Sequence, residues 1–198
     1  MQLSHSGFTE AEAKGLVGEL TFLESQILPR FDTLTSVRGW VGPEGSSQDF
    51  RISGVLIEVK TCELGSEKIT VSSLDQLNSG GKDLFLVVLS LTPSSDQNEA
   101  AFTLNELVVR IRAIVARDEA ALDEFNVRLA QTGYDERHAA ARLYFHIAQI
   151  RAYRVDEGFP TVTRTLIPAA ILSLSYVIDI SACTRFQCEL GDICDGHQ

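Results

Sequence analysis

Residues 48–61 read Gln-Asp-Phe-Arg-Ile-Ser-Gly-Val-Leu-Ile-Glu-Val-Lys-Thr, and this stretch decides the fold. Two runs rich in apolar and β-branched residues flank Ser53-Gly54, a dipeptide that suits a two-residue hairpin turn. Such a turn sets the register, because each residue before it pairs with the residue at the same distance after it. We therefore expect an antiparallel hairpin in which Asp49 lies opposite Glu58.

The two faces of this hairpin differ in character. Successive side chains of a strand point to opposite faces of the sheet. The apolar face carries Phe50, Val55, Ile57 and Val59. We expect this face to be buried in a core, and the second face to present Asp49, Glu58 and Lys60.

Two carboxylates that face each other across a strand pair repel unless a cation, a shared proton or solvent lies between them. Oxygen ligands at this spacing suit Mg²⁺ or Mn²⁺. Lys60 lies one strand step beyond Glu58, where its ammonium group can orient an attacking water and offset charge on a phosphate. The alternative is a solvated strand face on which Glu58 and Lys60 form a weak salt bridge.

A helix is predicted over residues 9–28. Thr9 and Glu12 have the spacing of a capping box at its beginning, and Pro29 ends it. The predicted buried stripe comprises Leu16, Leu20, Leu23 and Ile27. Glu19 lies on the flank of this stripe, about 60° from its centre. Its side chain either extends to water or, if the helix packs beside the hairpin, adds a third carboxylate there.

The remaining pattern favours an α+β fold, with a mixed central β-sheet flanked by helices and an additional C-terminal set of strands. Strands are predicted at residues 37–41, 68–72, 84–91, 147–155, 161–165 and 176–180, and helices at 103–116 and 119–131. Residues 84–91 are apolar on both faces, which predicts a strand at the centre of the sheet. Residues 137–147 are compatible with either helix or strand.

Length and composition are those of one globular domain: 198 residues, 44% hydrophobic and 22% charged. The formal net charge of −10 disfavours a protein whose whole surface grips nucleic acid. All basic residues after position 100 are arginines, which bind phosphate well, so the sequence is compatible with a local phosphate-binding surface. Arg110 and Arg117 share one helix face, where they either contact a phosphate backbone or pair with Glu106 or Asp118.

The sequence carries no run of about 18 apolar residues, and its first residues lack the pattern of a signal peptide. We therefore expect a cytoplasmic protein without a membrane span. Cys183, Cys188, Cys194 and His197 have a spacing that no standard zinc site uses, so we expect reduced thiols there rather than bound zinc.

An ordered set of short motifs runs along the chain: Gly-Leu-Val-Gly-Glu-Leu at 15–20, Trp-Val-Gly-Pro at 40–43, Gln-Asp-Phe at 48–50, Ile-Glu-Val-Lys-Thr at 57–61, Ser-Ser-Leu-Asp-Gln-Leu at 72–77, Tyr-Arg-Val-Asp-Glu-Gly-Phe-Pro at 153–160 and Ile-Asp-Ile-Ser-Ala-Cys at 178–183. This set resembles the PD-(D/E)XK nuclease superfamily. More narrowly, it resembles a group of bacterial proteins with this motif that are found near restriction-like and phage-defence genes. The resemblance implies a single domain with a restriction-endonuclease-like fold over residues 1–185. Residues 186–198 are unmatched, and we expect them to form a flexible acidic tail.

Carried over to the matching positions, the resemblance implies that Asp49 and Glu58 are metal ligands for Mg²⁺ or Mn²⁺. It implies that Lys60 is the catalytic lysine, and that Glu19 is the helix acid that supports the metal or its water. Gln76 lies where some branches of the superfamily place a polar residue near the site.

Gln48 stands where the nominal motif has a proline, a position whose side chain does no chemistry. The resemblance implies a metal-dependent endonuclease that hydrolyses DNA in a restriction or phage-defence system. Two alternatives share the same site: a weakly active or inactive binding subunit of a multi-protein defence complex, and a nuclease or phosphodiesterase directed at another substrate such as RNA. Besides DNA, other defence-system subunits or a second copy of the chain in a homodimer remain open as partners.

Overall fold

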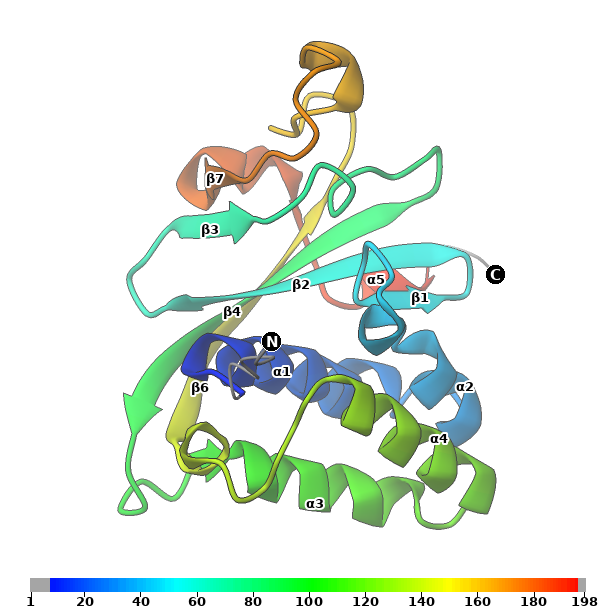
Figure 1. Ribbon diagram of the computed structural model, residues 1–198, viewed down its shortest axis with the longest axis vertical. Coiled ribbons are helices and arrows are strands. Elements are labelled where there is room, and N and C mark those ends of the chain that lie inside the picture. The colour runs from blue at the N-terminus through cyan, green and yellow to red at the C-terminus, as the bar shows by residue number, and fades with distance from the viewer. Residues whose placement is uncertain (1–7, 196–198) are drawn as a thin grey trace, which may run out of the picture.

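The computed structural model describes residues 8–195 and has the predicted α+β architecture, in which a mixed central sheet lies between two layers (Figure 1). One face of the sheet is covered by α1 (Glu10–Phe22), α2 (Thr33–Gly39), α3 (Leu104–Val115) and α4 (Glu119–Gln131). A smaller two-stranded sheet and its loops cover the other face. Each face has its own hydrophobic cluster, and the larger cluster lies under the helices.

The central sheet has the strand order β1 (Phe50–Ile52), β2 (Val55–Glu63), β4 (Leu84–Ser94), β6 (Tyr144–Arg154), β5 (Phe102–Thr103), and β8 (Gln187–Cys188) also pairs with β6. Strands β2 and β4 are parallel, and the other neighbours are antiparallel. The prediction of a central strand at 84–91 is confirmed, because β4 pairs with β2 on one side and with β6 on the other. All of its residues from 84 to 91 are buried, as a strand covered on both faces requires.

The hairpin of β1 and β2 has the predicted register. Phe50 pairs with Ile57, and the intervening turn has positive φ at both Ser53 (49°) and Gly54 (81°). Two such residues make a turn whose twist matches that of the strands it joins. Phe50 and Ile57 are fully buried, on the face that the sequence predicted as apolar.

Helix α1 begins at the predicted cap. Thr9 Oγ1 accepts the Glu12 N–H at 3.2 Å, and the Glu12 carboxylate accepts the Thr9 N–H at 2.6 Å. After Phe22 the helix continues as a π-helical turn, Leu23–Ile27, and it ends before Pro29. The predicted stripe of Leu16, Leu20, Leu23 and Ile27 is buried.

Helix α1 lies very close to β2 at Gly18. A Cβ atom on Gly18 would lie 2.5 Å from Thr61 Cγ2 and 3.5 Å from Val59 Cγ1, so the close approach depends on the missing side chain. This contact sets the distance between helix and strand, and the next residue of the helix, Glu19, is thereby brought toward the hairpin.

The opposite face of the sheet is covered by β3 (Lys68–Val71), β7 (Tyr176–Asp179) and a 3-10 helix, Ile180–Phe186. Side chains of these elements pack on Leu86, Val88 and Tyr153 of the central sheet. The strands predicted at 68–72 and 176–180 are therefore present. They form an antiparallel pair apart from the main sheet.

The strand predicted at 37–41 is wrong. These residues lie at the end of α2 and in the turn after it, and Trp40 makes only an isolated bridge, to Phe50. Asp32 caps α2 by accepting the Thr35 N–H at 2.9 Å. This cap, together with packing on α4, overrides the strand preference of the β-branched residues in the segment.

The strand predicted at 161–165 is also wrong, because Arg164–Leu166 forms a single 3-10 turn. The Arg164 guanidinium donates to the backbone carbonyls of Ala169 and Ile171, which closes the loop on itself. The ambiguous residues 137–147 divide between a 3-10 turn, Ala139–Arg142, and the beginning of β6.

Residues 186–195, expected as part of a flexible tail, contribute β8 and the short helix α5 (Asp192–Asp195). Cys188 pairs with Ala152 of β6, and Ile193 is buried in the cluster under the helices. The edge of β6 provides backbone partners for this segment, and Ile193 and Leu190 pack in or against the larger cluster. His197, which the zinc alternative needs, lies outside the described residues.

The helices are modest in length, and the longest α-helices, α1 and α4, have 13 residues each. A helix that crosses a bilayer needs about 20 predominantly apolar residues. Between residues 8 and 195, no helix has the length and apolarity for such a crossing.

Candidate active site

The candidate site forms where the hairpin opens. β1 is three residues long and begins at Phe50, so β2 has no strand partner on the β1 side after Ile57. On its other side β2 stays paired with β4. The Asp49 carboxylate takes the place of a strand partner on the β1 side, because its Oδ2 accepts the backbone N–H of Val59 at 2.7 Å. The hydrogen bond holds the Asp49 side chain against β2, next to Glu58.

Glu58 and Lys60 are two residues apart on β2 and form an ion pair. Glu58 is 1% exposed, and its Oε1 lies 2.8 Å from Lys60 Nζ. Its Oε2 is buried and has no hydrogen-bond partner among the described residues. A buried carboxylate oxygen is costly to leave unpaired, so Oε2 is an acceptor available to a cation or a water.

The loop after β3 holds Lys60 from the other side. Lys60 Nζ donates to Gln76 Oε1 at 3.1 Å, and the same oxygen accepts the Ser72 N–H at 2.7 Å. Gln48, in the position of the motif's proline, anchors this loop by donating from Nε2 to the Asp75 carbonyl at 2.6 Å. The Lys60 ammonium group therefore lies between two acceptors that the fold holds in place.

Glu19 approaches the site from α1. Trp40 Nε1 donates to Glu19 Oε2 at 2.7 Å. A Cβ atom on Gly42 would lie 3.3 Å from this oxygen and 3.1 Å from Asp49 Oδ1, so the two carboxylates border one small space. The sequence left two positions open for the Glu19 side chain, in water or beside the hairpin acids. The structure places it beside the hairpin acids.

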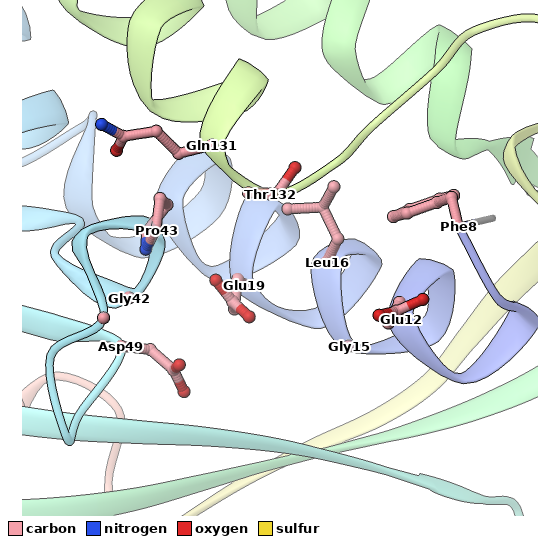
Figure 2. Close-up of a pocket in the computed structure, with 11 residues that line it drawn as sticks. Phe8, Glu12, Gly15, Leu16, Glu19, Gly42, Pro43, Asp49, Gln131 and Thr132 are labelled. Atoms are coloured by element: carbon pink, nitrogen blue, oxygen red, sulfur yellow. The ribbon is translucent and has the colours of Figure 1, made fainter. Parts of the chain in front are cut away.

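A cavity of about 320 Å³ opens beside these two carboxylates. Figure 2 shows Glu19 and Asp49 extending into the same space, with Gly42 and Pro43 at its rim. The remaining lining includes Glu12 and apolar atoms of Phe8 and Leu16. Solvent and small solutes therefore have access to the acids from the side of α1.

Burial raises the pKa of all three carboxyl groups, and the Asp49 charge raises the pKa of Glu58 and Glu19 further. Burial raises the pKa of Glu58 to about 8, with a further contribution from the Asp49 charge and an opposing one from Lys60. Burial also raises the pKa of Asp49 to about 6, although a backbone N–H and Lys60 oppose the shift. Burial and then the Asp49 charge hold the pKa of Glu19 well above its usual range, against the effect of the Trp40 N–H. Perturbed acids that cluster in this way are typical of functional sites.

The donor set fits a hard divalent cation that keeps several of its waters. Mg²⁺ prefers oxygen ligands and is commonly held by one or two carboxylates. Glu58 Oε2 is unpaired, and Asp49 is fixed beside it, so these two side chains can supply such ligands. In the described part of the chain, no three His, Cys, Asp or Glu side chains are grouped closely enough to hold an ion on their own. The arrangement is therefore a partial set of ligands rather than a complete cage.

Sequence reasoning missed two residues that hold the site together. Trp40 falls in the segment predicted as a strand, and its indole N–H meets Glu19 only because α1 and the turn after α2 come together. Arg128 of α4 is 5% exposed and donates to the Trp40 carbonyl at 2.5 Å. The sequence does indicate a role for Arg128. It follows Phe125 by three residues on the buried stripe of a predicted helix, where a charged residue is rare unless it is paired.

Arg110, considered as a phosphate contact, has a structural partner. Its Nε and Nη2 donate to the two carboxylate oxygens of Glu24 at 2.8 and 3.1 Å, and its guanidinium lies 4.9 Å from the centre of the Phe102 ring. The pairing joins α3 to the π-helical turn after α1. The hydrogen-bonded partner is Glu24, while Glu106, one of the partners that the sequence suggested, contributes only a longer-range attraction that raises the pKa of Arg110.

Residues 1–181 match the model of a family described as "Putative PD-(D/E)XK family member, (DUF4420)". The chain belongs to this family. Searches among curated proteins and among solved structures gave no match. In this PD-(D/E)XK family member, Asp49 and the Glu58-x-Lys60 unit follow the order of the motif, and the fold holds all three at one strand edge. Nucleases of the PD-(D/E)XK superfamily typically use Mg²⁺ or Mn²⁺, which agrees with the chemistry of the donor set.

Proposed function

We propose that this PD-(D/E)XK family member is a metal-dependent nuclease that hydrolyses DNA phosphodiester bonds, and that it acts in the cytoplasm in a restriction or phage-defence system. The observation that carries the proposal is the Glu58 carboxylate. It is buried, one of its oxygens lies 2.8 Å from Lys60 Nζ, and the other has no partner among the described residues. A buried acid destabilises a fold when only one of its oxygens is paired. Because Glu58 keeps this costly position beside a second acid, a catalytic use is supported.

Asp49 and Glu58 would hold Mg²⁺ or Mn²⁺, and Glu19 would support the ion or its waters from the side of α1. When bound, the ion supplies Lewis-acid chemistry: it lowers the pKa of a coordinated water and offsets charge on the phosphate. The carboxylates need to be ionised for this, and Lys60 favours the ionised form of both Asp49 and Glu58.

Lys60 would orient the attacking water. An ammonium group has three N–H donors. In the described part of the chain, one is directed at Glu58 Oε1 and one at Gln76 Oε1, at 2.8 and 3.1 Å. The third donor is left for the water or for a phosphate oxygen, and the two fixed acceptors give it a defined direction.

The test is cleavage of supercoiled plasmid DNA by the purified protein with Mg²⁺ or Mn²⁺, followed by gel electrophoresis. We expect nicked or linear product from the wild type, and a loss of at least a hundredfold in Asp49→Asn and Lys60→Ala. Linear single-stranded DNA and RNA of matched sequence, assayed in parallel, distinguish a DNA nuclease from one directed at RNA.

Two matched controls separate the site from the general charge of the surface. Lys82→Ala removes an exposed lysine, and Glu63→Gln removes an acid on the same strand as Glu58 whose side chain is 75% exposed. Both are expected to cleave like the wild type. Cleavage that persists in Asp49→Asn and Lys60→Ala would show that the activity comes from another site or from a contaminant.

A second candidate function is that of a weakly active or inactive binding subunit of a multi-protein defence complex. The absence of a complete three-ligand cage among the described residues and the net charge of −10 favour it. Calorimetric titration distinguishes the two, because an inactive binding subunit has no need to take up Mg²⁺ or Mn²⁺. A lack of heat at millimolar metal would favour the binding subunit over the nuclease.

A further inference from the structure

The segment 40–44 touches two of the site's acids at once. At its beginning, Trp40 Nε1 donates to Glu19 Oε2 at 2.7 Å. One and two residues later, the N–H groups of Val41 and Gly42 donate to the Asp49 backbone carbonyl at 2.8 and 3.0 Å. The segment therefore holds the backbone of Asp49 and the side chain of Glu19, although these two residues lie on different elements.

Arg128 fixes this segment to α4. Its guanidinium is buried and donates to the Trp40 carbonyl at 2.5 Å, and it pairs with Glu44 and Glu124 at 2.8 Å each. The Trp40 ring also lies against Phe125 of α4, with 5.9 Å between ring centres. Both ends of the segment are thus held by one helix that contributes none of the three acids.

We propose that Trp40 and Arg128 are positioning residues of the metal site: Arg128 holds the 40–44 segment, and the Trp40 indole N–H aims the Glu19 carboxylate at the space beside Asp49. The inference rests on the proposed metal-dependent function. It adds that the site depends on a contact chain from α4 through Trp40 to α1.

The physical reason lies in the geometry of the donors. A hydrogen bond from an indole N–H to a carboxylate fixes one oxygen and so the direction of the other. Without the N–H, Glu19 is free to take other rotamers, and repulsion from Asp49 favours those that turn it away. Loss of a charge-assisted hydrogen bond of this kind corresponds to about a tenfold change in an equilibrium constant.

The test measures Mn²⁺ affinity by calorimetry, and the melting temperature without metal, on the full chain. Trp40→Phe removes the N–H donor and keeps an aromatic ring. Phe125→Leu is the matched control, because it loosens the packing of the same ring and leaves the N–H in place. We expect Trp40→Phe to weaken Mn²⁺ binding about tenfold, and Phe125→Leu to change it by less than twofold.

A double-mutant cycle shows whether Trp40 acts through Glu19. In a Glu19→Gln background the indole no longer directs a carboxylate, so adding Trp40→Phe is expected to leave Mn²⁺ affinity unchanged. A purely structural role for Trp40 would predict the same loss in both backgrounds and an equal effect of Phe125→Leu. Either of those results would overturn the inference.

Arg128 is tested with Arg128→Met and Glu44→Gln. Arg128→Met removes all three contacts and is expected to weaken Mn²⁺ binding at least threefold, and to cause no further loss when it is added to Trp40→Phe. If this variant does not fold, Glu44→Gln breaks only the contact at the end of the segment and is expected to weaken binding by about twofold. Unchanged affinity in the folded variants would overturn the role of Arg128.

The outcomes separate the inference from the proposed function. If the wild type binds no Mn²⁺ at millimolar concentration, both fail. If the wild type binds Mn²⁺ and Trp40→Phe binds it equally well, the metal site stands and the positioning role is refuted.

Discussion

Lys60 Nζ lies 2.8 Å from Glu58 Oε1, and the second oxygen of the same carboxylate is buried without a partner in the described part of the chain. The lysine thus pairs with one of the two carboxylate oxygens and leaves the other without a partner. Asp49 and Glu19 are also acids, so they add to the negative charge of Glu58 and do not compensate it.

Glu58→Gln is expected to stabilise the metal-free protein at pH 8. The pKa of Glu58, about 8 in the folded protein, lies above its ordinary value of 4.5. The neutral carboxyl therefore contributes stability that is complete below pH 4.5 and is lost as the pH rises through 8, and a glutamine does not lose it. Urea denaturation in EDTA is expected to show wild type falling by a few kcal/mol relative to the variant over this range. Glu63→Gln on the same strand is the control, and parallel pH curves for wild type and Glu58→Gln would contradict the prediction.

Mg²⁺ or Mn²⁺ is expected to stabilise the wild type, and more strongly at pH 8 than at pH 6. Metal ions compete with protons for Glu58 and Asp49, whose pKa values are raised to about 8 and about 6. At a tenfold excess over Kd, linkage gives about 1.4 kcal/mol, or roughly 4 °C in Tm. Differential scanning calorimetry measures this, with NaCl at equal ionic strength as the control. An equal shift in Asp49→Asn would place the binding elsewhere.

Gly42→Ala is expected to weaken metal binding and cleavage about tenfold or more. Its Cβ would enter the space between Asp49 Oδ1 and Glu19 Oε2, at 3.1 and 3.3 Å, and would push one carboxylate away. Gly15→Ala is the matched control. It lines the same cavity and has nothing within 4 Å of its Cβ position. Because Gly15 lies inside α1, alanine there should stabilise the protein by about 0.5–1 kcal/mol and leave cleavage unchanged.

Gln76→Leu is expected to lower kcat for cleavage roughly tenfold to a hundredfold with little change in KM. The variant removes the oxygen that accepts from Lys60 Nζ at 3.1 Å and from the Ser72 N–H at 2.7 Å, so the ammonium loses one of its fixed acceptors. Gln76→Glu keeps an acceptor there and should retain more activity. Asn78→Leu alters an exposed amide in the same loop and serves as the control. Equal activity of Gln76→Leu and Asn78→Leu would remove Gln76 from the site.

Local sequence determined the centre of the candidate site. Ser53-Gly54 specified the hairpin, and strand alternation then placed Phe50 and Ile57 in the core, as the structure confirms. Turn type and side-chain alternation depend on neighbouring residues only, so they are readable without the rest of the chain. The roles of Asp49, Glu58 and Lys60 in catalysis stay predictions that the experiments above address.

Segments whose structure depends on distant partners were less predictable. Residues 37–41 carry β-branched side chains that favour a strand, but the Asp32 cap and the packing of α2 on α4 make most of them helical. Residues 186–195 looked like an acidic tail, yet β8 finds an edge on β6 and Ile193 a place in the core. In both cases a tertiary contact outweighs a weak local preference.

The sequence by itself determined the hairpin register, the capped first helix and the central strand, because turns, caps and apolar periodicity act over a few residues. Only the tertiary structure decided that Glu19 meets Asp49, that Trp40 donates to Glu19 and that Arg128 donates to the Trp40 carbonyl. These contacts join residues far apart in the chain. They exist because α1 lies close on β2 at Gly18 and because α4 packs on α2 and on the 3-10 turn Gly42–Glu44.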